Sequence, residues 1–341
     1  MNRMSNKALQ VLNKAKPGNF NFQTFTDFLI KRGPLLLFAI LIIVLALGSS
    51  SFLSGPSLSS SLVQAAPIAI IAMALSLVVM GGGDDVVAGG IDLSLPGSAA
   101  LATAIISDQL TNQGSSFAMA VLFGLLAAMA VGLVNAVLVS YVGLTSILAT
   151  LATYVSVVGV VRVLTGNKRI DVTDPTILYI RDGNIFGIPV VVVIMLLTFA
   201  LVAFIFHRTK YGMSVQAVGG SLDAAIAAGL KTKRIVGSTF ISAAVVAAIA
   251  AVLLVARGSG SSPGMDERLL VDMVLATFVG AAFSSRNVVT VLGSMLGAIL
   301  VTFMSTGLVL NRINNSWIDG WKGVLILLVV VAAAVQIKGR K

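Results

Sequence analysis

The chain has 341 residues, of which 57% are hydrophobic and only 11% are charged. Soluble domains carry roughly 25% charged residues, so this composition excludes an ordinary soluble enzyme and indicates a membrane protein with several spanning helices. The net charge of +10 lies in loops and tails between apolar segments. This distribution is topogenic and speaks against a nucleic-acid partner, which needs a basic patch on a soluble face.

Residues 1–33 are polar and basic, and they are followed by an apolar run from Pro34 to Phe52. A secretory signal would have a shorter charged region and a small-residue cleavage site. We therefore expect 1–33 to be a cytoplasmic segment and the apolar run to be a retained helix. Residues 34–337 are predicted to form a single transmembrane domain, with 338–341 as a cytoplasmic tail.

The apolar segments predict an all-α polytopic membrane protein with about ten transmembrane helices, some of them broken or short. The helices are expected at about 34–53, 61–80, 97–110, 117–140, 143–164, 187–207, 235–257, 270–283, 288–310 and 321–337. If both termini are cytoplasmic, most of the 23 basic residues lie on the cytoplasmic side, as the positive-inside rule requires.

Residues 89–98, GGIDLSLPGS, lie between two long apolar segments and contain an acid, hydroxyls, a proline and several glycines. Irregular backbone at membrane depth is tolerated only where protein or a water-filled cavity satisfies its polar groups. We therefore expect a helix break, with Asp92 and Ser94 as candidates for a substrate pathway. The alternative for Asp92 is a carboxylate that caps the following helix.

Three other polar residues, Asn135, Asp272 and Asn311, lie in or near apolar segments. Polar groups there are costly, so each is a candidate for the substrate pathway. Each could equally form a hydrogen bond between helices. Gly293 and Gly297 form a GxxxG pattern, which favours close helix packing over a pore-lining role.

The segment 208–234 is the longest connection on the expected cytoplasmic side. Ser221 stands at a possible N-cap, Asp223 in the first turn, and Gly229 at a possible C-cap. These are the start and stop signals of a short helix. From the residues alone, such a helix could dock another protein or lie on the membrane surface.

Signatures of nucleotide hydrolysis are absent, since the sequence contains no GxxxxGK[ST] motif. If ATP drives this protein, another chain binds it. The sequence has no cysteine and only one histidine, so we expect neither a metal site nor a cofactor bound by this chain. The sequence shows no nucleophile–base pairing, so a membrane enzyme is the least favoured alternative. An ion-coupled transporter would need more buried charges than the helix interiors hold.

The segment GGIDLSLPGSAALATAI, starting at residue 89, resembles the signature of ribose-type (monosaccharide) ABC transporter permeases. Other stretches are similar to further family segments, and the resemblance covers most of residues 60–335. These stretches are GLVNA at 132–136, LATLAT through LTG at 148–166, and TKYG through AVGGS and AA to Gly229 at 209–229.

The resemblance implies an importer subunit of the bacterial inner membrane that moves a monosaccharide or similar small polar solute. It implies a second permease in a homo- or heterodimer, a cytoplasmic ABC ATPase that holds ATP and Mg, and a periplasmic or lipid-anchored substrate-binding protein. Nucleosides or branched-chain amino acids are the alternative solutes, and an ion-coupled transporter working alone is a third possibility. By the same resemblance, the residues that couple to the ATPase are Gly219, Gly220, Ser221, Leu222, Asp223, Ala224, Ala225 and Gly229.

Overall fold

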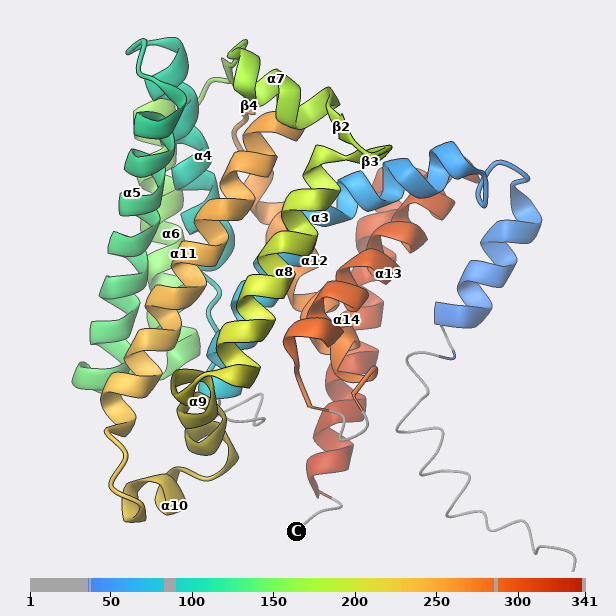
Figure 1. Cartoon of the computed structure of the whole chain (residues 1–341). Helices are drawn as coiled ribbons and strands as arrows, with labels where there is room; N and C mark the ends of the chain where they lie inside the picture. Colours follow the sequence, from blue (N-terminus) through green and yellow to red (C-terminus); the bar gives the residue numbers. More distant parts are fainter. Residues whose placement is uncertain (1–35, 37, 83–89, 285–287, 339–341) are drawn as a thin grey trace, which may run out of the picture.

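The computed structural model describes residues 36, 38–82, 90–284 and 288–338 (Figure 1). The expected N-terminal segment 1–33 and the start of the predicted break, with Gly89, lie outside these ranges. The described part is mostly helical. An apolar helix covers Phe38–Gly48, and the later helices are α3 (Gly55–Gly82), α4 (Leu95–Thr111), α5 (Phe117–Val137), the π-helix η1 (Leu138–Val142), α6 (Ser146–Thr165), α7 (Pro175–Asp182), α8 (Val190–Arg208), α9 (Lys210–Gly220), α10 (Leu222–Ala227), α11 (Thr232–Gly258), α12 (Met265–Ala281), α13 (Val291–Leu310) and α14 (Asn315–Lys338).

Within the described residues, six helices are long and apolar enough to cross a membrane: α3, α5 continued by η1, α6, α8, α11 and α13. The chain is therefore an all-α multi-pass membrane protein, as its composition predicts. A helix also lies over each of the other expected ranges. Two of these helices, α4 and α12, have 17 residues each, in line with the expectation that these segments are short.

The centre of the bundle is formed by α3 and α11, which pack against one another. In their most apolar windows, 83% and 72% of the residues are buried, against 28% for α5 and α6. Helices that are apolar all round belong in a protein interior. Figure 1 shows α4, α5 and α6 on one side of this pair and α12, α13 and α14 on the other.

Close contact between α12 and α13 depends on glycines. A Cβ atom added to Gly280 or Gly293 would collide with the backbone of the other residue, and one added to Gly297 would collide with the Ala276 carbonyl. Small residues allow helix backbones to approach closely in lipid. The packing role predicted for the GxxxG pattern is therefore confirmed.

One end of the molecule carries α7 and two small antiparallel sheets (Figure 1). In the first sheet, Ile170 pairs with Ser261 and Asp171 pairs with Gly260. The second is a hairpin whose turn contains Phe186, a fully exposed residue with φ of 51°. These four two-residue strands are β1 (Ile170–Asp171), β2 (Asn184–Ile185), β3 (Ile188–Pro189) and β4 (Gly260–Ser261).

The opposite end carries α9 and α10 (Figure 1). The short helix predicted after Ser221 is confirmed as α10, because the Ser221 side chain accepts a hydrogen bond from the Ala224 N–H at 3.3 Å. Gly229 has a φ of +75°, the left-handed conformation that favours glycine after a helix. The preceding helix α9 was not predicted, and it contains Gly219 and Gly220 of the proposed coupling segment.

Candidate solute pathway

The expected helix break lies between α3 and α4, and the hydroxyls of α6 satisfy its backbone. The Ile91 N–H donates to Ser146 Oγ at 3.0 Å, and the Leu93 N–H donates to Thr150 Oγ1 at 3.0 Å. Both hydroxyls also donate to the Ile91 carbonyl. Three backbone groups of the irregular segment therefore find partners inside the bundle, and such pairing is the condition for irregular structure at membrane depth.

Three of the predicted site residues meet at this break. Asp92 Oδ1 accepts hydrogen bonds from the Ser94 backbone N–H at 2.8 Å and from Ser94 Oγ at 2.6 Å. Ser94 Oγ in turn accepts a hydrogen bond from Asn135 Nδ2 of α5 at 2.6 Å. All three residues are at most 1% exposed. The resulting chain of hydrogen bonds fixes the entry of α4 against α5.

In this geometry the Asp92 carboxylate bonds the residue that precedes the first turn of α4, a position close to the helix cap that the sequence left open. A carboxylate that bonds the N–H two residues ahead forms an Asx-turn, and here the turn leads into α4. Ser94 is the N-cap residue of α4. Solute contact by Asp92, Ser94 or Asn135 stays a prediction.

Replacing Asp92 separates these two roles. We expect Asp92→Ala to lower the free energy of unfolding by about 1–3 kcal/mol, because Ser94 would keep a buried N–H without a partner. Asp92→Asn keeps an acceptor oxygen and should lose much less stability. Thermal midpoints in detergent and solute flux are measured on both variants. Normal stability with abolished flux in Asp92→Asn would instead place the charge in the pathway.

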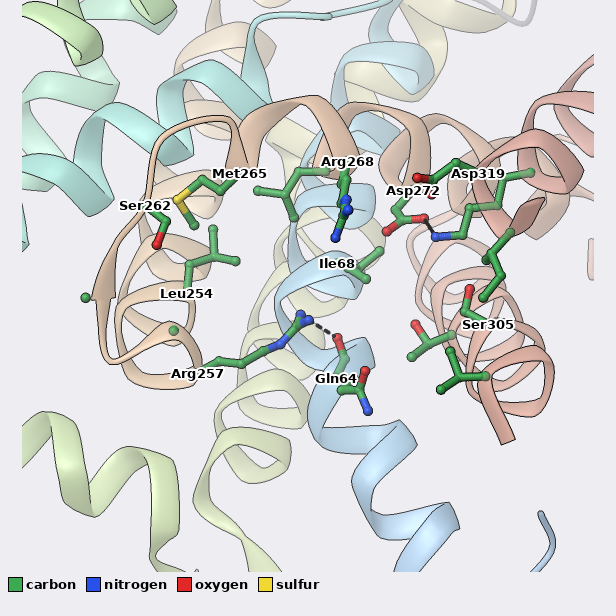
Figure 2. A pocket seen from close by; sticks show the side chains of 17 residues that line it. Gln64, Ile68, Leu254, Arg257, Ser262, Met265, Arg268, Asp272, Ser305 and Asp319 are labelled. Carbon is green, nitrogen blue, oxygen red and sulfur yellow. Dashed lines mark hydrogen bonds and ion pairs between the residues drawn. The ribbon is translucent and has the colours of Figure 1, made fainter. Parts of the chain in front are cut away.

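A cavity with a volume of about 560 Å³ lies elsewhere (Figure 2). Pockets for small ligands usually have volumes of about 300–1,000 Å³. The wall is built from the first half of α3, the last turn of α11, the first half of α12, the second half of α13 and the start of α14. Because it includes Gly260 of β4, the cavity lies at the α7 end of the molecule, away from α10.

Asp272 is the predicted site residue that lines this cavity. Its Oδ1 lies 2.7 Å from Lys322 Nζ of α14, and both side chains are about one-tenth exposed. Asn311 does not line the cavity. Its Nδ2 donates to the Leu45 carbonyl at 3.2 Å and to the Gly307 carbonyl at 2.8 Å, so it ties α13 to the helix before α3.

Several residues of the cavity and of the helix break were not predicted from the sequence. Arg257, Arg268 and Lys322 were not proposed as site residues, yet they share one cavity. Ser146 and Thr150 were not proposed as partners of the break. Their spacing of four residues places two hydroxyls on one helix face, and this is the signal that could have identified them.

In the described part of the chain, six helices able to cross a membrane, a hydrogen-bonded helix break and a charged cavity define a multi-pass membrane protein. Residues 57–334 match the family model described as "Branched-chain amino acid transport system / permease component". The chain belongs to this family, whose members are transport subunits.

Curated relatives include the galactofuranose transporter permease protein YtfT of Escherichia coli, which is 29% identical over 79% of this chain and 76% of its own length. The probable ABC transporter permease protein YphD of the same organism is 30% identical over 88% of each chain. The ribose import permease protein RbsC of Bacillus subtilis is 26% identical over 90% of this chain and 94% of its own. The resemblance to ribose-type permeases is thereby confirmed. No solved structure gives a significant match.

Proposed function

We propose that this chain is the membrane-spanning subunit of an ATP-driven importer for a monosaccharide or similar small polar solute in the bacterial inner membrane. A second permease completes the translocation path, and a separate ABC ATPase binds ATP and Mg. A substrate-binding protein delivers the solute. The family of the chain and the sugar-permease names of its relatives support this proposal.

The observation that carries the ATPase coupling is the surface of α10. Leu222 and Ile226 are 53% and 56% exposed, and their spacing of four residues places them on one helix face. In Figure 1, α10 lies at the tip of the molecule, beyond α9. An exposed apolar pair on a capped helix outside the bundle suits a protein partner. In the both-ends-inside orientation, this tip is cytoplasmic and the cavity opens outside.

The two central helices connect this tip with the cavity. Near its C-terminal end α3 contacts α9, where Gly81 adjoins Val215, and near its start it supplies Gln64 to the cavity wall. Helix α11 begins just after α10 and ends with Leu254 and Arg257 in the same wall. With 28 and 27 residues, each helix is about 40 Å long. In this mechanism, movement of the ATPase at α10 shifts α3 and α11 and changes access to the cavity.

The test replaces an apolar residue at the tip by a charge. We expect Ile226→Asp to abolish co-purification of the ATPase and solute uptake, because a carboxylate would lose its water at an apolar contact. The matched control is Phe186→Asp, an equally apolar-to-acidic change on an exposed turn at the opposite end. Both variants are tagged, purified in mild detergent and analysed by mass spectrometry for the associated ATPase.

Two results would contradict the proposal. One is co-purification of as much ATPase with the Ile226→Asp variant as with the wild type, which would mean that α10 does not contact the ATPase. The other is the absence of any ATPase from the wild-type chain even after gentle crosslinking. Uptake driven by an ion gradient in ATPase-free vesicles would then indicate a stand-alone transporter.

A further inference from the structure

The cavity holds an imbalance of charge. Its wall contains three basic side chains, Arg257, Arg268 and Lys322, and two acidic ones, Asp272 and Asp319. Asp272 and Lys322 form an ion pair within it. Taken together, the five groups leave one net positive charge in a space of about 560 Å³.

Among the described residues, both arginines have N–H donors that no hydrogen bond uses. Arg257 donates a long hydrogen bond of 3.4 Å to the carbonyl of Gln64 in α3. Arg257 interacts electrostatically with the carboxylate of Asp272, but that carboxylate already forms an ion pair with Lys322. Arg268 forms neither a hydrogen bond nor an ion pair with any residue in the described part of the chain.

Figure 2 shows the two guanidinium groups pointing toward one another across the cavity, Arg257 from α11 and Arg268 from α12. A guanidinium presents five N–H donors in a planar fork, and this fork matches the oxygens of a carboxylate or phosphate. Two such groups facing a shared space, with no carboxylate paired to either, suit an anionic group of a ligand.

The remaining polar wall suits hydroxyls. Gln64 contributes an amide, and Ser262, Thr302 and Ser305 contribute hydroxyl groups. Neutral donors and acceptors of this kind fix the orientation of a polar ligand. The single net charge favours a monoanion over a dianion, since a dianion would leave the cavity with a negative charge.

We propose that this cavity binds a hydroxylated solute that carries one carboxylate, that is, a sugar acid. Arg257 and Arg268 hold the carboxylate, and the amide and hydroxyl side chains hold the rest. The Asp272–Lys322 pair keeps a second acid from competing for the arginines. This proposal rests on the proposed function, because it identifies the solute class of the same permease.

Direct binding tests the solute class without the ATPase. The full-length chain is purified in detergent, and the dissociation constants of galacturonate, galactose, galactose 6-phosphate and leucine are measured by calorimetry. We expect galacturonate to bind at least about tenfold more tightly than the other three, because only it provides one carboxylate with hydroxyls. Failure of this test leaves the ATPase association at α10 untouched, so the two proposals can fail separately.

Variants show whether the arginines are responsible. Arg257→Gln and Arg268→Gln should each weaken galacturonate binding by at least about tenfold. The control is Arg208→Gln, which removes the same charge from an exposed site at the end of α8, next to α9. Equal affinity for galactose and galacturonate, unchanged binding in both cavity variants, or tighter binding of the phosphate or of leucine would overturn the proposal. Loss of binding-protein association in the cavity variants, with no effect on the sugar acid, would instead assign the arginines to a protein partner.

Discussion

Gly297→Ala is expected to lower the free energy of unfolding by about 3 kcal/mol, the upper range for an overpacked interior. The added methyl group would collide with the Ala276 carbonyl of α12, and backbone cannot move aside as a flexible side chain can. Helices α12 and α13 would therefore have to separate along their glycine contact. The measurement is the yield and thermal midpoint of the monodisperse protein in detergent.

The matched control is Gly159→Ala in α6. A Cβ atom there meets nothing within 4 Å, and the residue lies on an exposed face of a spanning helix. Alanine favours a helix by about 1 kcal/mol over glycine, so this variant should be neutral or slightly stabilised. A similar loss in both variants would mean that helix packing is not what Gly297 provides.

The sequence predicts features that depend on neighbours in the chain. Ser221 and Gly229 mark the two ends of α10 because an N-cap and a left-handed C-terminal glycine act within a few residues. Gly293 and Gly297 reveal a packing face because their spacing alone places them on one side of a helix. The break around Asp92 is visible because polar residues interrupt an apolar run.

Features that depend on the packing of distant helices could not be predicted in the same way. Thr150 bonds both to its own helix and to the break, and its own sequence context signals only the first of these bonds. Arg257 is in the last turn of α11 and Arg268 in the first turn of α12, and neither position in the chain indicates a shared site. Their approach to one cavity follows from how α11 and α12 pack around α3, which no local pattern records.

Removing one partner of the Asp272–Lys322 pair should destabilise the protein more than removing both. We expect Lys322→Met to lower the free energy of unfolding by about 3–5 kcal/mol, because it leaves the buried carboxylate of Asp272 without its counter-charge. The double variant Asp272→Asn with Lys322→Met removes both charges and should recover most of this loss. Thermal midpoints of the two single variants, the double variant and the wild type give the coupling energy.

The comparison pair is Arg181 and Asp182 of α7, which has the same separation of 2.7 Å but is 38% and 63% exposed. Arg181 also donates a hydrogen bond to Ser259 Oγ. Water screens an exposed pair, so Arg181→Met should change the thermal midpoint much less than Lys322→Met. If Lys322→Met cost no more than Arg181→Met, the cavity would have to be open enough for water to solvate Asp272. Apolar packing would then stabilise the interface between α12 and α14, and the Lys322 ammonium would be available to bind a solute.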